Sequence, residues 1–131
     1  MKIENLTIQE AEEKIDQANL HIKQIEIKKT ELQQTLNKQK DEKTDLKNKK
    51  STTLKSIQEE IKKQRTPTAK ESKRKQKIRE SNSFDNRIKS KENEIKKTRD
   101  KIAELNSDKA HINKIKELIK QHVKQLKKTE I

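Results

Sequence analysis

The chain lacks several residue types on which most active sites depend. Its 131 residues include no glycine, cysteine, tryptophan or tyrosine, with a single proline, Pro67, and a single phenylalanine, Phe84. Without cysteine there is no disulfide framework, thiol nucleophile or cysteine-based zinc site. Without glycine, neither a phosphate-binding loop nor a GxSxG nucleophile motif can form.

Apolar residues are also scarce, at 25% of the chain against 44% charged residues. No apolar run exceeds two residues, so the sequence predicts no membrane insertion. It is expected to act inside the cell, in the cytoplasm, or in the nucleus of a eukaryote. The three histidines show no metal-ligand spacing, and the carboxylates alternate with lysines as on helix surfaces. We therefore predict a protein that is not an enzyme and that uses neither cofactor nor metal.

The apolar residues that are present recur with a seven-residue period, which is typical of coiled coils. In the first half the period begins at Ile8 and shifts near Lys50, and in the second half it runs from Phe84 to Leu126. Heptad positions a and d of the first half are Ile8, Ala11, Ile15, Ala18, Ile22, Ile25, Lys29, Leu32, Leu36, Gln39, Lys43, Leu46, Lys50, Thr53 and Ile57. Those of the second half are Phe84, Ile88, Lys91, Ile95, Thr98, Ile102, Leu105, Lys109, Ile112, Lys116, Ile119, Val123 and Leu126.

The two heptads become complementary if the chain folds back at Pro67, close to its midpoint. Residues equidistant from Pro67 then face each other, and polar positions of one helix mostly meet apolar positions of the other. The exception is Lys43, which faces Lys91. A parallel homodimer would stack Lys29, Lys43 and Lys109 each on its own copy, and each would form a like-charge layer. The pattern therefore predicts an all-α fold, a long antiparallel coiled-coil helical hairpin; a kink at Pro67 in one long helix is the alternative.

Local signals predict where the helices begin and end. Thr7 and Glu10 match a capping box, and Thr68 and Glu71 match another just after the proline. A residue that precedes proline is disfavoured in a helix. The sequence thus predicts a single domain with a first helix over 7–65, a turn over 66–68 and a second helix over 69–129. The polar run 81–83 is a weak point where the second helix could break.

The predicted turn carries a dense cluster of positive charge, which we call the tip, residues 62–79. It holds nine basic residues against one acidic residue, a net charge of +8 of the chain's +13. Such a cluster attracts phosphate backbones and gains affinity from counterion release. A merely solvated loop and a targeting signal remain alternative interpretations. The candidate nucleic-acid-binding residues are Lys62, Lys63, Arg65, Lys70, Lys73, Arg74, Lys75, Lys77 and Arg79.

Apolar residues outside the heptad seam mark a second candidate surface near the open end of the hairpin. Exposed apolar stripes often mark partner sites, although scattered surface leucines are also normal. The candidate partner or oligomer residues are Leu6, Leu20, Ile27, Ile115 and Leu118. Two hairpins pairing here into a four-helix assembly would bury them, and so would a larger partner.

Two functions from different classes fit these features. The first is binding of a polyanion, above all a nucleic-acid phosphate backbone, through the tip. Since the tip has no aromatic residue on which bases could stack, such binding is expected to be tolerant of sequence. The second is a structural, adaptor or inhibitor role in which the hairpin docks onto an acidic protein surface.

Overall fold

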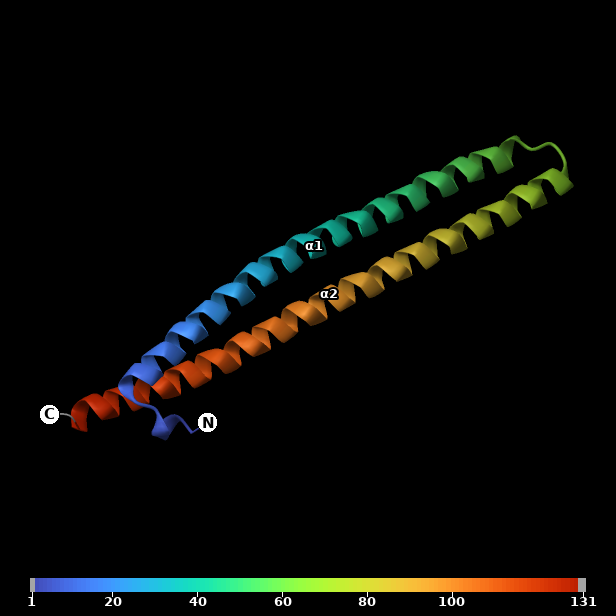
Figure 1. The fold of residues 1–131 in the computed structure, drawn as a ribbon. Helices are drawn as coiled ribbons and strands as arrows, with labels where there is room; N and C mark the ends of the chain where they lie inside the picture. The colour runs from blue at the N-terminus through green and yellow to red at the C-terminus, as the bar shows by residue number, and fades with distance from the viewer. Residues whose placement is uncertain (1, 130–131) are drawn as a thin grey trace. The chain divides into compact units, whose positions relative to one another are not determined.

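The computed structural model describes residues 2–129 and shows an all-α helical hairpin (Figure 1). A short 3-10 turn, η1 (Ile3–Asn5), precedes two long helices, α1 (Ile8–Lys63) and α2 (Pro67–Thr129). The described residues include no strand, and none of their helices is long and apolar enough to cross a bilayer. The turn at Pro67 confirms the predicted hairpin over the alternative of one kinked helix.

The start of α1 is the predicted capping box. The Thr7 hydroxyl accepts a hydrogen bond from the Glu10 backbone N–H at 3.2 Å, and the Glu10 carboxylate accepts one from the Thr7 N–H at 3.3 Å. These reciprocal bonds satisfy two backbone donors that the first helical turn leaves without a partner.

The start of α2 differs from the prediction, because Thr66 rather than Thr68 caps it. The Thr66 hydroxyl accepts a hydrogen bond from the Ala69 N–H at 3.1 Å, and the Thr66 carbonyl accepts one from Lys70. Pro67 is then the first helical residue, where its missing N–H costs nothing and its fixed φ suits the helix. The loop is therefore residues 64–66, and α1 ends at Lys63 rather than Arg65.

α2 continues without interruption through residues 81–83, where the sequence suggested a possible break. Ser81 and Ser83 are half-buried. Their low helix propensity costs only tenths of a kcal/mol each, and packing against a second helix overrides a deficit of that size.

The chain divides into two compact units, and each is described separately. Unit 1 comprises Met1–Gln33 and Asp100–Ile131. Its largest buried cluster joins Leu6 and Ala11 to Ile119 and Val123, with Ile3, Ile8 and Ile15 packed against them.

Leu6 was predicted to lie on an exposed partner surface, and this is wrong, because only 6% of it is exposed. The residues before α1 fold back over the hairpin rather than extending the helix. η1 turns the chain, and the Leu6 carbonyl lies 2.9 Å from His122 Nε2 of α2. The heptad assignment placed Leu6 on the outer face because it assumed helical geometry where there is none.

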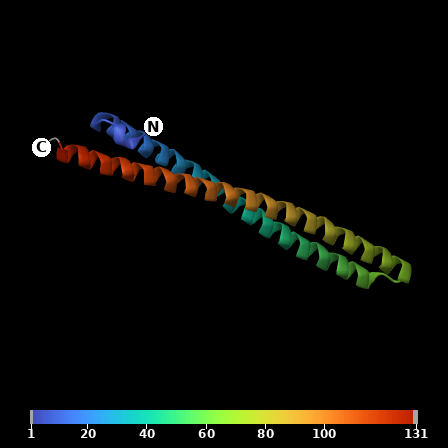
Figure 2. The same cartoon turned by 90° about the horizontal axis from the view of Figure 1, so that it is seen from below.

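Unit 2, Gln34–Arg99, contains the loop and the facing halves of α1 and α2, which lie side by side in both views (Figures 1 and 2). Cross-helix contacts join residues nearly equidistant from Pro67, as predicted. Glu42 and Lys91 lie 25 residues before and 24 residues after it, and their charged groups are 2.8 Å apart. The buried apolar residues of unit 2 are Leu36, Ile57, Ile61, Phe84 and Ile95.

Candidate polyanion-binding surface

The net positive charge of the chain lies almost entirely in unit 2. This unit holds 22 basic and 10 acidic residues, a net charge of +12. Unit 1 holds 13 basic and 12 acidic residues, a net charge of +1. The asymmetry therefore extends well beyond the tip, and the field that attracts an anion belongs to the whole of unit 2.

The structure separates the nine predicted tip residues into two groups. Six are exposed, Lys70 is half-buried, and Lys73 and Lys77 reach across to α1. Among the exposed six, Lys62 pairs with Glu59 at 3.5 Å and Arg74 with Glu71 at 3.7 Å. Within residues 2–129, no carboxylate lies within 4 Å of the other four, which are Lys63, Arg65, Lys75 and Arg79.

Lys73 and Lys77 have a structural role that the charge count did not reveal. Lys73 Nζ lies 3.0 Å from the Glu60 carboxylate, and Lys77 Nζ donates to the Gln58 side chain at 3.0 Å. Both contacts join α2 to α1 beside the buried Ile57 and Ile61. Their aliphatic stems can cover this apolar surface while the ammonium groups reach polar partners.

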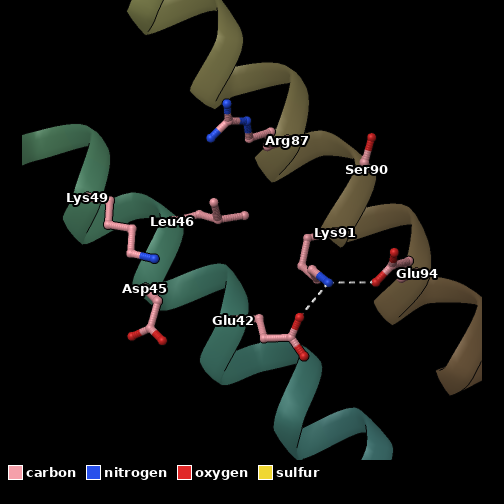
Figure 3. Close-up of a pocket in the computed structure, with 8 residues that line it drawn as sticks. All are labelled: Glu42, Asp45, Leu46, Lys49, Arg87, Ser90, Lys91 and Glu94. Carbon is pink, nitrogen blue, oxygen red and sulfur yellow. Dashed lines mark hydrogen bonds and ion pairs between the residues drawn. The ribbon is translucent and has the colours of Figure 1, made fainter. Parts of the chain in front are cut away.

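The expected clash between Lys43 and Lys91 is resolved by carboxylates beside each lysine. Lys91 Nζ lies 2.8 Å from Glu42 across the hairpin and 2.9 Å from Glu94 on its own helix (Figure 3). Lys43 pairs with Glu92 at 3.2 Å. The two lysines thus turn to opposite sides of the seam, each toward an acidic residue of the other helix.

These contacts fix the charge states along the seam. Hydrogen bonding to Glu42, and then to Glu94, raises the pKa of Lys91, while the hydrogen bond from Lys91 lowers the pKa of Glu42. In unit 1, Lys109 lies 2.7 Å from Glu26 and likewise lowers the pKa of that carboxyl. Glu26, Glu42 and Lys91 are therefore held in their charged forms at neutral pH, and the ammonium groups of Lys91 and Lys109 each lie beside a carboxylate.

A basic groove that was not predicted from the sequence lies on one flank of unit 2. It measures about 300 Å³ and is lined by Lys40, Lys43, Thr44, Lys47, Glu92, Ile95 and Arg99. Its lining holds four cationic side chains and one carboxylate. Lys40, Lys43 and Lys47 lie within eight residues of α1, and the pairing of α1 with α2 brings Arg99 to the same groove.

Four of the five predicted partner residues are exposed. The exposed fractions are 58% for Leu20, 54% for Ile27, 38% for Ile115 and 46% for Leu118, all in unit 1. Ile115 lines a shallow groove of about 230 Å³ together with Ile112, Ile119 and Ala18. Ile78, which is 61% exposed within the tip, is an apolar surface residue that the sequence reasoning missed.

Comparison with known proteins identified no relative: no family model, curated protein or solved structure matches this chain. Its function is therefore argued from the charge distribution and geometry described above.

Proposed function

We propose that this chain is a non-enzymatic helical hairpin, with coiled-coil packing, that binds a nucleic-acid phosphate backbone through its basic tip. The observation that carries the proposal is the group of four tip cations, Lys63, Arg65, Lys75 and Arg79, which have no carboxylate partner among the described residues. Unit 2 supplies a surrounding net charge of +12. Such a surface attracts a polyanion over long range and releases its counterions on contact.

The available side chains indicate how binding would occur. Lysine and arginine donate to phosphate oxygens, and arginine can do so with two parallel hydrogen bonds. Phe84, the single aromatic residue, is 8% exposed, and its ring is covered by Arg87 at 5.4 Å. It therefore offers no platform for a base, and we expect affinity that depends steeply on salt and little on sequence.

The test is a variant in which Lys63, Arg65, Lys75 and Arg79 are all replaced by glutamine. It spares Lys73 and Lys77, which hold the two helices together. We expect it to lose most affinity for short random-sequence DNA and RNA, measured by fluorescence anisotropy across a salt series. If all four contact phosphates, the slope of log K against log salt should fall by about 3.6, at about 0.9 for each contact.

The matched control removes four exposed lysines of unit 1, in the variant Lys23→Gln, Lys101→Gln, Lys114→Gln and Lys124→Gln. It has the same net charge as the tip variant and should keep nearly the whole salt slope. Equal losses in the two variants would show that net charge alone matters. No binding by the unmodified protein at low salt would overturn the proposal and favour docking onto an acidic protein surface.

We also propose that unit 1 mediates association with a second copy of the chain. It exposes Leu20, Ile27, Ile115 and Leu118, and its net charge of only +1 allows two copies to approach. Two copies of unit 2 would instead bring charges of +12 together and repel. Pairing through unit 1 would create a four-helix assembly and cover the apolar side chains.

Sedimentation equilibrium tests this association. The unmodified protein should show a mass that approaches two chains as its concentration rises, whereas Leu20→Glu with Leu118→Glu should stay at one chain. Asn19→Glu with Gln125→Glu adds the same charge at exposed polar positions of unit 1 and should behave as the unmodified protein does. A single-chain mass for the unmodified protein at every concentration would contradict the proposal.

A further inference from the structure

The basic groove of unit 2 contains more positive charge than its own carboxylate can neutralise. Lys43 Nζ lies 3.2 Å from Glu92, the single acidic residue of the lining. No carboxylate of the described chain, Glu92 included, lies within 4 Å of the charged groups of Lys40, Lys47 or Arg99. Three cationic groups from two helices therefore converge on one groove without an anionic partner.

Residues of both α1 and α2 line the groove, so the packing of the two helices sets its shape. Ile95, 5% exposed, is the buried apolar residue of the lining. The Thr44 hydroxyl donates back to the Lys40 carbonyl at 3.1 Å, which satisfies its proton within α1. The lining residues that remain available to a ligand are thus cationic nitrogen donors, which suit phosphate oxygens.

The opposite flank of the same segment has no such excess. Heptad positions e and g lie on opposite sides of a helical seam. The groove uses the e positions Lys40, Lys47 and Arg99, while the g positions Glu42, Lys49 and Arg87 line the pocket in Figure 3. That pocket is lined by three basic and three acidic side chains and is electrically balanced.

We propose that the groove of Lys40, Lys47 and Arg99 is a second phosphodiester-binding site, so that a nucleic-acid backbone bound at the tip also contacts this flank of unit 2. The inference rests on the proposed function and specifies which face of unit 2 the ligand meets. Lys40 and Lys47 are separated by about 10 Å along α1. That distance covers about three phosphates of one strand at 3.4 Å each along the duplex axis.

The test compares two double variants of identical net charge. Lys47→Gln with Arg99→Gln removes one lysine of α1 and one arginine of α2 from the groove. Lys49→Gln with Arg87→Gln removes the same residue types from the opposite flank, and all four side chains are exposed. Binding to short random-sequence duplexes of DNA and of RNA is measured by anisotropy across a salt series, after circular dichroism confirms equal helicity.

We expect the groove variant to lower the salt slope by about 2, which corresponds to two lost phosphate contacts, and the control to lower it by less than about 0.5. Comparing the two duplexes shows which backbone the groove prefers. Equal reductions in both variants would overturn the groove site. An unchanged salt slope in the groove variant would also overturn the groove site. If the tip variant had lost binding in the same experiment, the proposed function would still stand. Failure of the unmodified protein to bind either duplex would instead remove the proposed function itself.

Discussion

Replacing Ile95 with alanine is expected to lower the free energy of unfolding by about 2 to 4 kcal/mol, whereas the same change at Ile78 should alter it by less than about 0.5 kcal/mol. Ile95 is 5% exposed in the seam and Ile78 is 61% exposed. Truncation at position 95 removes buried apolar surface and leaves a cavity that a pair of helices can only partly close. Urea titration followed by circular dichroism at 222 nm provides the measurement.

The two positions form a matched pair, since both are isoleucines within α2 and unit 2. The change in helix propensity is therefore the same in both variants, and only the burial differs. Equal losses in the two variants would show that unit 2 is not stabilised by its seam. In that case the paired carboxylates and lysines would have to carry its stability.

The second large effect is a gain in stability. Thr98, 6% exposed, places its hydroxyl 2.8 Å from the Gln39 side-chain oxygen and 3.1 Å from the Glu94 carbonyl. Replacing both polar residues, in the variant Gln39→Leu with Thr98→Ile, should raise the free energy of unfolding by about 2 kcal/mol. Burial of two larger apolar side chains contributes about 1.5 to 3 kcal/mol each when complete, which exceeds the 0.5 to 1.5 kcal/mol of a lost hydrogen bond.

The two single variants complete a double-mutant cycle. Gln39→Leu leaves the Thr98 hydroxyl with the Glu94 carbonyl and should change stability little, whereas Thr98→Ile leaves the Gln39 amide against an apolar side chain and should destabilise. The change in the free energy of unfolding of the double variant is therefore expected to exceed the sum of the changes in the two single variants. A double variant less stable than the unmodified protein would mean that this polar layer holds the helices together more strongly than apolar packing does.

The helical seam was predictable because a seven-residue apolar period has few other structural explanations. Each assigned seam residue, from Ile8 to Ile57 and from Phe84 to Leu126, is buried or half-buried. The first capping box was also predictable, because Thr7 and Glu10 interact within a single helical turn. These features depend on neighbours close in sequence or on one strong symmetry about Pro67.

Local sequence patterns led to wrong predictions where two residues could cap the same helix and where the chain is not α-helical. Thr66 and Thr68 both resemble caps, and the preference of proline for the first helical position decides between them in favour of Thr66. Leu6 was assigned to an outer face by extending the heptad of α1 toward the N-terminus. The chain before Ile8 is not α-helical, however, and Leu6 packs in the buried cluster with Val123.

The candidate binding surface was predictable in its charge but not in its detail. Composition identifies residues 62–79 as strongly basic, but it does not distinguish Lys73 from Lys75. In the structure Lys73 reaches Glu60 of α1, while Lys75 has no carboxylate within 4 Å among the described residues. Which lysines remain available to a ligand depends on partners 13 or more residues away, and a linear pattern does not contain that information.

The order of the residues is enough to dictate two helices, their turn and their facing register, because each follows from periodicity and from one proline. Tertiary pairing alone decides the exposed cationic surface. It neutralises Lys43 and Lys91 with Glu92 and Glu42, and it gathers Lys40, Lys47 and Arg99 into one groove. The physical reason is that a charge is neutralised or left exposed by the atoms within a few ångströms of it, and in a hairpin most of those atoms come from the other helix.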